Sequence, residues 1–142
     1  MTPPETTELT FPSRLGAVDD AAEAVAELLR RIGADERLMY DVEVAVREAV
    51  ANAVVHGNHQ DPAKTVLVTV TAAPEALELT VHDEGAGFDP EAVPDPTAPD
   101  QILRGTGRGL LLIRSFMDEA EWLIRTGGGI TVRMIKKRRA TW

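Results

Sequence analysis

The stretch Asp41-Val-Glu-Val-Ala-Val-Arg-Glu-Ala-Val-Ala-Asn-Ala-Val-Val-His-Gly57 has the clearest helical pattern in the chain. Its apolar residues recur at every third or fourth position, which predicts a helix with one buried face. Gly57-Asn58 interrupts the pattern, so we expect the helix to end at His56. Glu48 and Asn52 are one helical turn apart, so they share a face and lie about 6 Å apart along the axis.

The segments on either side of this helix predict a small α+β domain. Residues 17–32 have a second helical pattern, and residues 8–12 have the composition of an edge strand. The other predicted elements are strands at 65–71, 76–82, 119–125 and 129–136, and a helix at 110–117. This order predicts a two-layer α/β sandwich with a mixed or antiparallel sheet and helices on one face. Residues 1–142 are expected to form one domain, with residues 1–7 as a flexible tail.

Composition excludes several classes of protein. The 142 residues are 44% hydrophobic and 27% charged, which is typical of a globular domain and not of a disordered chain. The absence of cysteine excludes disulfides and thiolate metal sites. A formal net charge of −8 argues against direct nucleic-acid binding. The longest strongly apolar run, Leu110 to Ile113, is too short to cross a membrane, so we expect a cytoplasmic protein with no membrane partner.

Glu48 and Asn52 are candidates for phosphoryl chemistry. Mg²⁺ commonly takes only one or two protein ligands beside substrate phosphates, so one Asn oxygen is a sufficient anchor. A carboxylate one turn away is placed to accept a proton from an attacking hydroxyl group. The alternative is that Asn52 is an exposed helix residue and that Glu48 belongs to an ordinary ion pair.

The stretch His82-Asp-Glu-Gly-Ala-Gly-Phe88 follows a predicted strand. A carboxylate at a strand end, such as Asp83, can accept a hydrogen bond from the amine of adenine. Gly85 and Gly87 would let the backbone pass close to a flat base. The alternative is an ordinary turn, in which Asp and Gly are the commonest residues.

Residues 84–107 lack periodicity and contain four prolines, which favours a functional lid over ordinary structure. The glycine-rich end of this segment precedes a helix and would direct free N–H groups toward an anion. Neither a dinucleotide-binding fingerprint nor a P-loop occurs in the chain. A flexible hinge is the alternative to a phosphate-binding lid.

A metal site at His56, His59 and His82 is disfavoured because the glycine after His56 would separate the rings.

The order of these motifs resembles the N, G1 and G2 boxes of the GHKL (Bergerat-fold) ATPases. The matching stretches are Glu48-Ala-Val-Ala-Asn52-Ala-Val-Val-His56-Gly57, Asp83-Glu-Gly85-Ala-Gly87-Phe88 and Gly105-Thr106-Gly107-Arg108-Gly109-Leu110. Within that superfamily the chain is similar to the anti-sigma-factor serine kinases, through details such as Phe88-Asp-Pro90 and Phe116-Met-Asp118. The likeness extends from about Phe11 to Arg138, so we expect no sensor or phosphoacceptor domain.

This resemblance implies a Bergerat ATP-binding fold with ATP and Mg²⁺ between the sheet and the helices. It implies a general base at Glu48, a magnesium ligand at Asn52, an adenine reader at Asp83, a base platform at Gly85 and Gly87, a phosphate lid at Gly105 to Leu110, and a threonine near adenine at Thr131. Arg47 departs from the small polar residue that some relatives have before the base.

The resemblance also implies the partners. They are an anti-sigma-factor antagonist that is phosphorylated on serine, a sigma factor that is sequestered by partner switching, and a second copy of the chain in a homodimer. One alternative is a regulatory module that binds nucleotide without transferring phosphate. Another is the catalytic domain of a histidine kinase, but the chain has no attached helix with a phosphoacceptor histidine.

Overall fold

The computed structural model describes residues 5–85, 109–125 and 128–137. The elements are β1 (Glu5–Pro12), α1 (Gly16–Arg31), α2 (Glu36–Asn52), the π-helix η1 (Ala53–Gly57), β2 (Thr65–Ala72), β3 (Ala76–Asp83), α4 (Gly109–Phe116), β4 (Glu119–Ile124) and β5 (Ile130–Lys137). This sequence of helices and strands confirms the predicted order. None of the described helices combines the length and the apolar character needed to span a bilayer.

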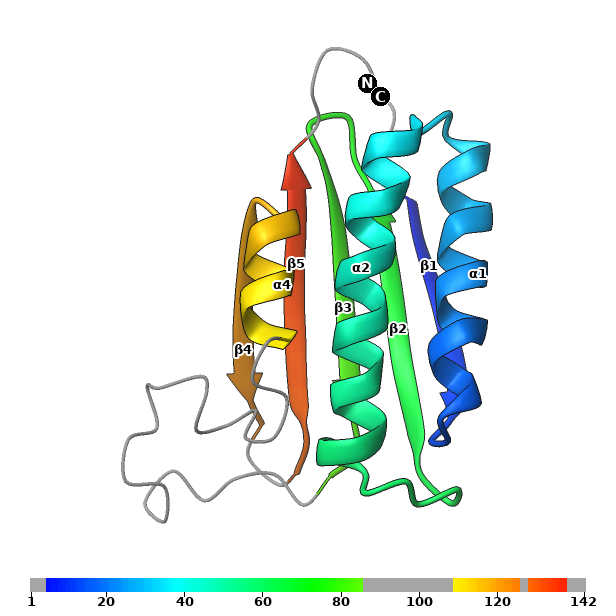
Figure 1. The fold of residues 1–142 in the computed structure, drawn as a ribbon, viewed down its shortest axis with the longest axis vertical. Helices are drawn as coiled ribbons and strands as arrows, with labels where there is room; N and C mark the ends of the chain where they lie inside the picture. Colours follow the sequence, from blue (N-terminus) through cyan, green and yellow to red (C-terminus); the bar gives the residue numbers. More distant parts are fainter. Residues whose placement is uncertain (1–4, 86–108, 126–127, 138–142) are drawn as a thin grey trace.

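The strands form a five-stranded sheet in the order β1-β2-β3-β5-β4, in which every neighbouring pair is antiparallel. The prediction of an α+β sandwich with helices on one face is confirmed, and α1, α2 and α4 cover the same side of the sheet (Figure 1). β1 is an edge strand, as predicted. It begins at Glu5, which corrects the expectation that residues 5–7 belong to a flexible tail.

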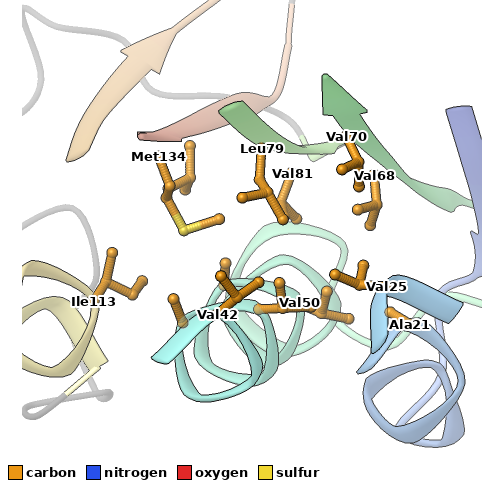
Figure 2. Close-up of a cluster of buried hydrophobic side chains, with 14 of the residues drawn as sticks. Ala21, Val25, Val42, Val50, Val68, Val70, Leu79, Val81, Ile113 and Met134 are labelled. Atoms are coloured by element: carbon orange, nitrogen blue, oxygen red, sulfur yellow. The ribbon is translucent and has the colours of Figure 1, made fainter. Parts of the chain in front are cut away.

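The core lies between the helices and the sheet because each element has one apolar face. β2 and β3 alternate between buried and half-buried residues, so every second side chain points toward the helices. Met134 and Leu79 of the sheet face Ile113 and Val42 of the helix layer (Figure 2). All four side chains are completely buried, which holds α2 and α4 against the strands.

The helix predicted around Glu48 is present, but it changes form near its end. Asp35 caps its first turn, because its carboxylate accepts a hydrogen bond from Leu38 N at 2.8 Å. The α-helix ends at Asn52, and the chain continues to Gly57 as a π-helix instead of ending at His56 as an α-helix. Such wider turns often occur at functional sites.

Candidate functional site

Asp83 lies at the end of β3 and is 6% exposed. Its Oδ1 atom accepts hydrogen bonds from Gly85 N at 3.0 Å and from Ile130 N at 3.2 Å. Within the described residues, Oδ2 accepts no hydrogen bond. Burial raises the pKa of Asp83, while the N–H groups of Gly85 and Ile130 act in the opposite direction. Asp83 is therefore an oriented carboxylate with one oxygen left for a ligand.

Glycines allow three segments to meet at Asp83. A Cβ atom on Gly57 would lie 2.3 Å from Asp83 Oδ2, and one on Gly129 would lie 2.2 Å from the backbone oxygen of Asp83. A Cβ on Gly85 would lie 2.3 Å from the backbone oxygen of Gly57. Side chains at these positions would displace the carboxylate or the backbone beside it. The end of η1, the turn after β3 and the start of β5 thus form a closely packed cradle.

Asn58 connects the parts of this cradle by hydrogen bonds, whereas the sequence pattern assigned it only to the end of a helix. It is 1% exposed, its Nδ2 atom donates to Thr65 O at 2.9 Å, and its Oδ1 atom accepts from Glu84 N at 2.8 Å. Glu84 in turn accepts hydrogen bonds from the backbone N–H and the hydroxyl group of Thr65. These bonds lower the pKa of Glu84, the backbone bond most strongly. The buried amide therefore holds the exit of η1 beside the Asp83 turn.

Asn52 is the last residue of α2 and is 5% exposed. Its Nδ2 atom is buried and has no hydrogen-bond partner among the described residues. Buried polar side chains are nearly always satisfied, so an unsatisfied one points to a missing ligand. Because rotation about the last side-chain bond exchanges the amide nitrogen and oxygen, Asn52 can offer an oxygen to a cation. Asn52 thus fits a metal ion or a metal-bound nucleotide.

Glu48 lies half-buried one turn before Asn52 on α2. It has neither an ion pair nor a hydrogen bond among the described residues. The neighbouring Arg47 instead contacts Asp19 of α1 at 2.6 Å and Glu43 of α2 at 3.3 Å. The ordinary ion pair considered as an alternative for Glu48 is therefore not found in this part of the chain.

Thr131 is not brought together with the Asp83 carboxylate. It pairs with His82 across β3 and β5, so Thr131 and His82 share one face of the sheet while Asp83 occupies the other. The Thr131 hydroxyl contacts His82 Nδ1 at 2.9 Å and accepts a hydrogen bond from Arg125 Nε at 2.7 Å. Burial, followed by the charge of Arg125, lowers the pKa of His82. The residue at the start of β5 that lies on the same face of the sheet as Asp83 is Ile130, and not Thr131.

The glycine-rich segment is described only in part. Gly87, Gly105, Thr106, Gly107 and Arg108 lie outside the described residues. Gly109 begins α4, and Leu110 follows it in the helix, so the predicted change from the glycine-rich stretch to a helix is present. Figure 1 shows α4 beginning beside the second half of α2, with its first turn directed toward the end of the molecule where α2 and β3 end. The described residues contain no group of three or more His, Asp or Glu side chains placed to hold a metal ion.

Comparison with known proteins gives consistent results. Residues 11–136 match the family described as Histidine kinase-like ATPase domain. The chain is similar to the serine-protein kinase RsbW of Halalkalibacterium halodurans, with 30% identity over 94% of this chain and 83% of the relative. It is also similar to the anti-sigma F factor of Geobacillus stearothermophilus, with 31% identity over 90% of this chain and 89% of the relative.

A solved structure has the same fold. It contains the RsbU and RsbW domains of a Mycobacterium tuberculosis protein, and it matches 99% of this chain with a TM-score of 0.70 and 24% identity. This chain spans 34% of that longer chain. The structural match supports the Bergerat-type arrangement that the sequence motifs predict.

Proposed function

The chain belongs to the histidine kinase-like ATPase domain family, and we propose that it is an ATP-dependent serine-protein kinase that also acts as an anti-sigma factor. The similarity to a serine-protein kinase and to anti-sigma F factors extends over most of the chain and supports this proposal. In this function the protein phosphorylates an antagonist on serine and alternatively binds a sigma factor. It works as a homodimer in the cytoplasm.

ATP lies with its adenine against Asp83 and its phosphates toward α2 and α4. Asp83 Oδ2 accepts a hydrogen bond from the adenine amine, because Oδ1 is already engaged by Gly85 and Ile130. As the resemblance to the GHKL ATPases implies, we assign Gly85 and Gly87 to the flat base and residues 105–110 to the phosphates. The free N–H groups at the start of α4 favour this position for negative charge.

Asn52 would hold magnesium together with the nucleotide phosphates. The unsatisfied, buried amide of Asn52 fits this role. A bound Mg²⁺ neutralises charge on the transferring phosphoryl group.

Glu48 acts as the general base. Its carboxylate accepts the proton of the antagonist serine while the serine oxygen forms a bond to the γ-phosphorus of ATP. The bond from that phosphorus to the β,γ-bridging oxygen breaks, and ADP leaves. Glu48 has no ion partner among the described residues. This observation supports phosphoryl transfer in addition to nucleotide binding, because an unpaired carboxylate can accept a proton.

Incubation with γ-labelled ATP, magnesium and a purified antagonist from the same genome tests the function. We expect label on a serine of the antagonist and none when magnesium is omitted. Binding of ATP without label transfer to any antagonist of that genome would favour the alternative of a nucleotide-binding regulatory module.

Asn52→Ala is expected to weaken ATP binding about tenfold in the presence of magnesium and by less than about twofold in EDTA, because the lost group binds the metal and not the base. Calorimetric titrations of both proteins, with and without magnesium, measure this difference. Equal losses in the two conditions would remove Asn52 as the metal ligand. Asn58→Ala serves as a contrast, because loss of the cradle amide should weaken binding in both conditions.

Thr131→Val is expected to change ATP affinity by less than about threefold, because its hydroxyl group faces His82 and Arg125 on the other side of the sheet. The same substitution should lower the melting temperature, since two hydrogen bonds to the hydroxyl are lost. ATP titration and thermal unfolding on one preparation measure both effects. A tenfold loss of ATP affinity in a stable Thr131→Val protein would show instead that Thr131 contributes to adenine binding.

A further inference from the structure

A largely but not fully buried cation joins three elements at the end of the molecule that lies away from Asp83. Lys136 Nζ of β5 lies 3.2 Å from Asp41 Oδ2 of α2, and the two side chains are 13% and 12% exposed. The same Nζ donates a hydrogen bond to the backbone oxygen of Phe116, the last residue of α4, at 2.7 Å. Lys136 therefore connects the helix that carries Glu48 and Asn52 to the helix that follows the glycine-rich segment.

The C-terminal end of α4 is also tied to β5 by the turn that follows the helix. Asp118 N donates to Ile135 O at 2.9 Å, and Lys137 N donates to Asp118 Oδ2 at 2.6 Å. A positive charge at a helix C-terminus interacts favourably with the helix dipole and with the free carbonyl groups of the last turn. Lys136 supplies that charge for α4, and its ion pair with Asp41 fixes where the charge lies.

The two helices connected by Lys136 run in opposite directions. α2 leads from Asp41 toward Asn52, and α4 leads from Gly109 to Phe116, so the start of α4 lies beside the second half of α2 (Figure 1). Asp41 precedes Glu48 by about 10 Å along α2. Each helix is continuous between its two ends, so fixing the far ends relative to each other also constrains the ends near the nucleotide.

We propose that Lys136 is a positioning residue that aligns the N-terminus of α4 with Glu48 and Asn52, so that phosphates bind between α2 and α4. The inference rests on the proposed function, because it requires ATP at this end of the helices. Lys136 itself touches neither base nor phosphate. Its loss should therefore weaken binding of the triphosphate more than binding of a nucleotide held mainly by its adenine.

Lys136→Met tests the proposal when the dissociation constants of ATP and AMP are both measured well below the melting temperature. We expect the dissociation constant of ATP to increase about fivefold and that of AMP to increase less than about twofold. The size of the effect is consistent with the modest strength of helix-terminus interactions. Lys136→Arg, which keeps the charge and the donors, should restore the ratio of the two constants. A purely structural role would weaken both nucleotides equally.

Lys137→Met is the matched control, because the side chain of this neighbouring lysine makes an exposed ion pair with Glu119 of β4. It should leave both constants unchanged. Should Lys136→Met fail to fold, Asp41→Asn should lower the preference for ATP over AMP by about twofold, because it weakens the link to α2 alone. An unchanged ratio in the folded variants overturns the role of Lys136. A wild-type protein that binds no ATP overturns the proposed function instead.

Discussion

Glu48→Gln is expected to bind ATP with nearly wild-type affinity and to phosphorylate the antagonist about two to four orders of magnitude more slowly, the usual effect of losing a positioned general base. Glutamine has the size of glutamate but cannot accept the serine proton. The wild-type carboxylate has no ion partner among the described residues, so its replacement removes no such contact there. The melting temperature should therefore change little.

Phosphoryl transfer, ATP affinity and melting temperature should be measured on the same preparations of this variant. Glu43→Gln is the matched control, because it removes another carboxylate of α2 that contacts Arg47 and lies outside the site. The control should transfer phosphate at the wild-type rate. Wild-type transfer by a stable Glu48→Gln protein would exclude Glu48 as the base.

Asp83→Asn is expected to weaken ATP binding about 100-fold, which corresponds to about 2.7 kcal/mol. The Asn oxygen can replace Oδ1 and accept from Gly85 and Ile130, which leaves the amide N–H₂ where Oδ2 was. Two donors, the amide and the adenine amine, then face each other in a buried site, and neither finds an acceptor. Because burial already disfavours the charged form of Asp83, the neutral side chain should be tolerated by the fold.

Calorimetric titration with ATP measures this loss, and thermal unfolding checks that the protein remains folded. Glu84→Gln is the control, because its side chain is exposed, contacts Thr65 and retains an oxygen acceptor. This variant should bind ATP like the wild type. An Asp83→Asn protein that is folded and binds ATP with unchanged affinity would place the adenine elsewhere.

The helical part of the site could be predicted because helix periodicity determines which residues share a face. The spacing of Glu48 and Asn52 put them one turn apart on one helix, and α2 has this arrangement. The strand before Asp83 could be predicted at 76–82, as the hairpin partner of the strand with alternating β-branched residues at 65–71, and β3 ends one residue later, at Asp83. Each signal was local in sequence, and the order of the three motifs identified the family, which the comparisons confirm.

The contacts made between distant strands could not be predicted in this way. Thr131 lies one position beyond the residue that faces Asp83, and a change of one residue along a strand moves a side chain to the other face. Asn58 joins Thr65 and Glu84, which are separated from it along the chain, so its buried role depends on tertiary structure. The π-helix also escaped prediction, because its apolar residues continue the pattern of α2.

A crystal structure with magnesium and a non-hydrolysable ATP analogue would test the nucleotide site in one measurement. We expect the adenine amine within about 3 Å of Asp83 Oδ2, a usual hydrogen-bond distance. We also expect the metal ion about 2.1 Å from the Asn52 side-chain oxygen, a usual Mg²⁺–oxygen distance, and the γ-phosphate on the side of α2 that carries Glu48. An analogue bound away from Asp83, or a metal ion without Asn52 as a ligand, would contradict this assignment of the site.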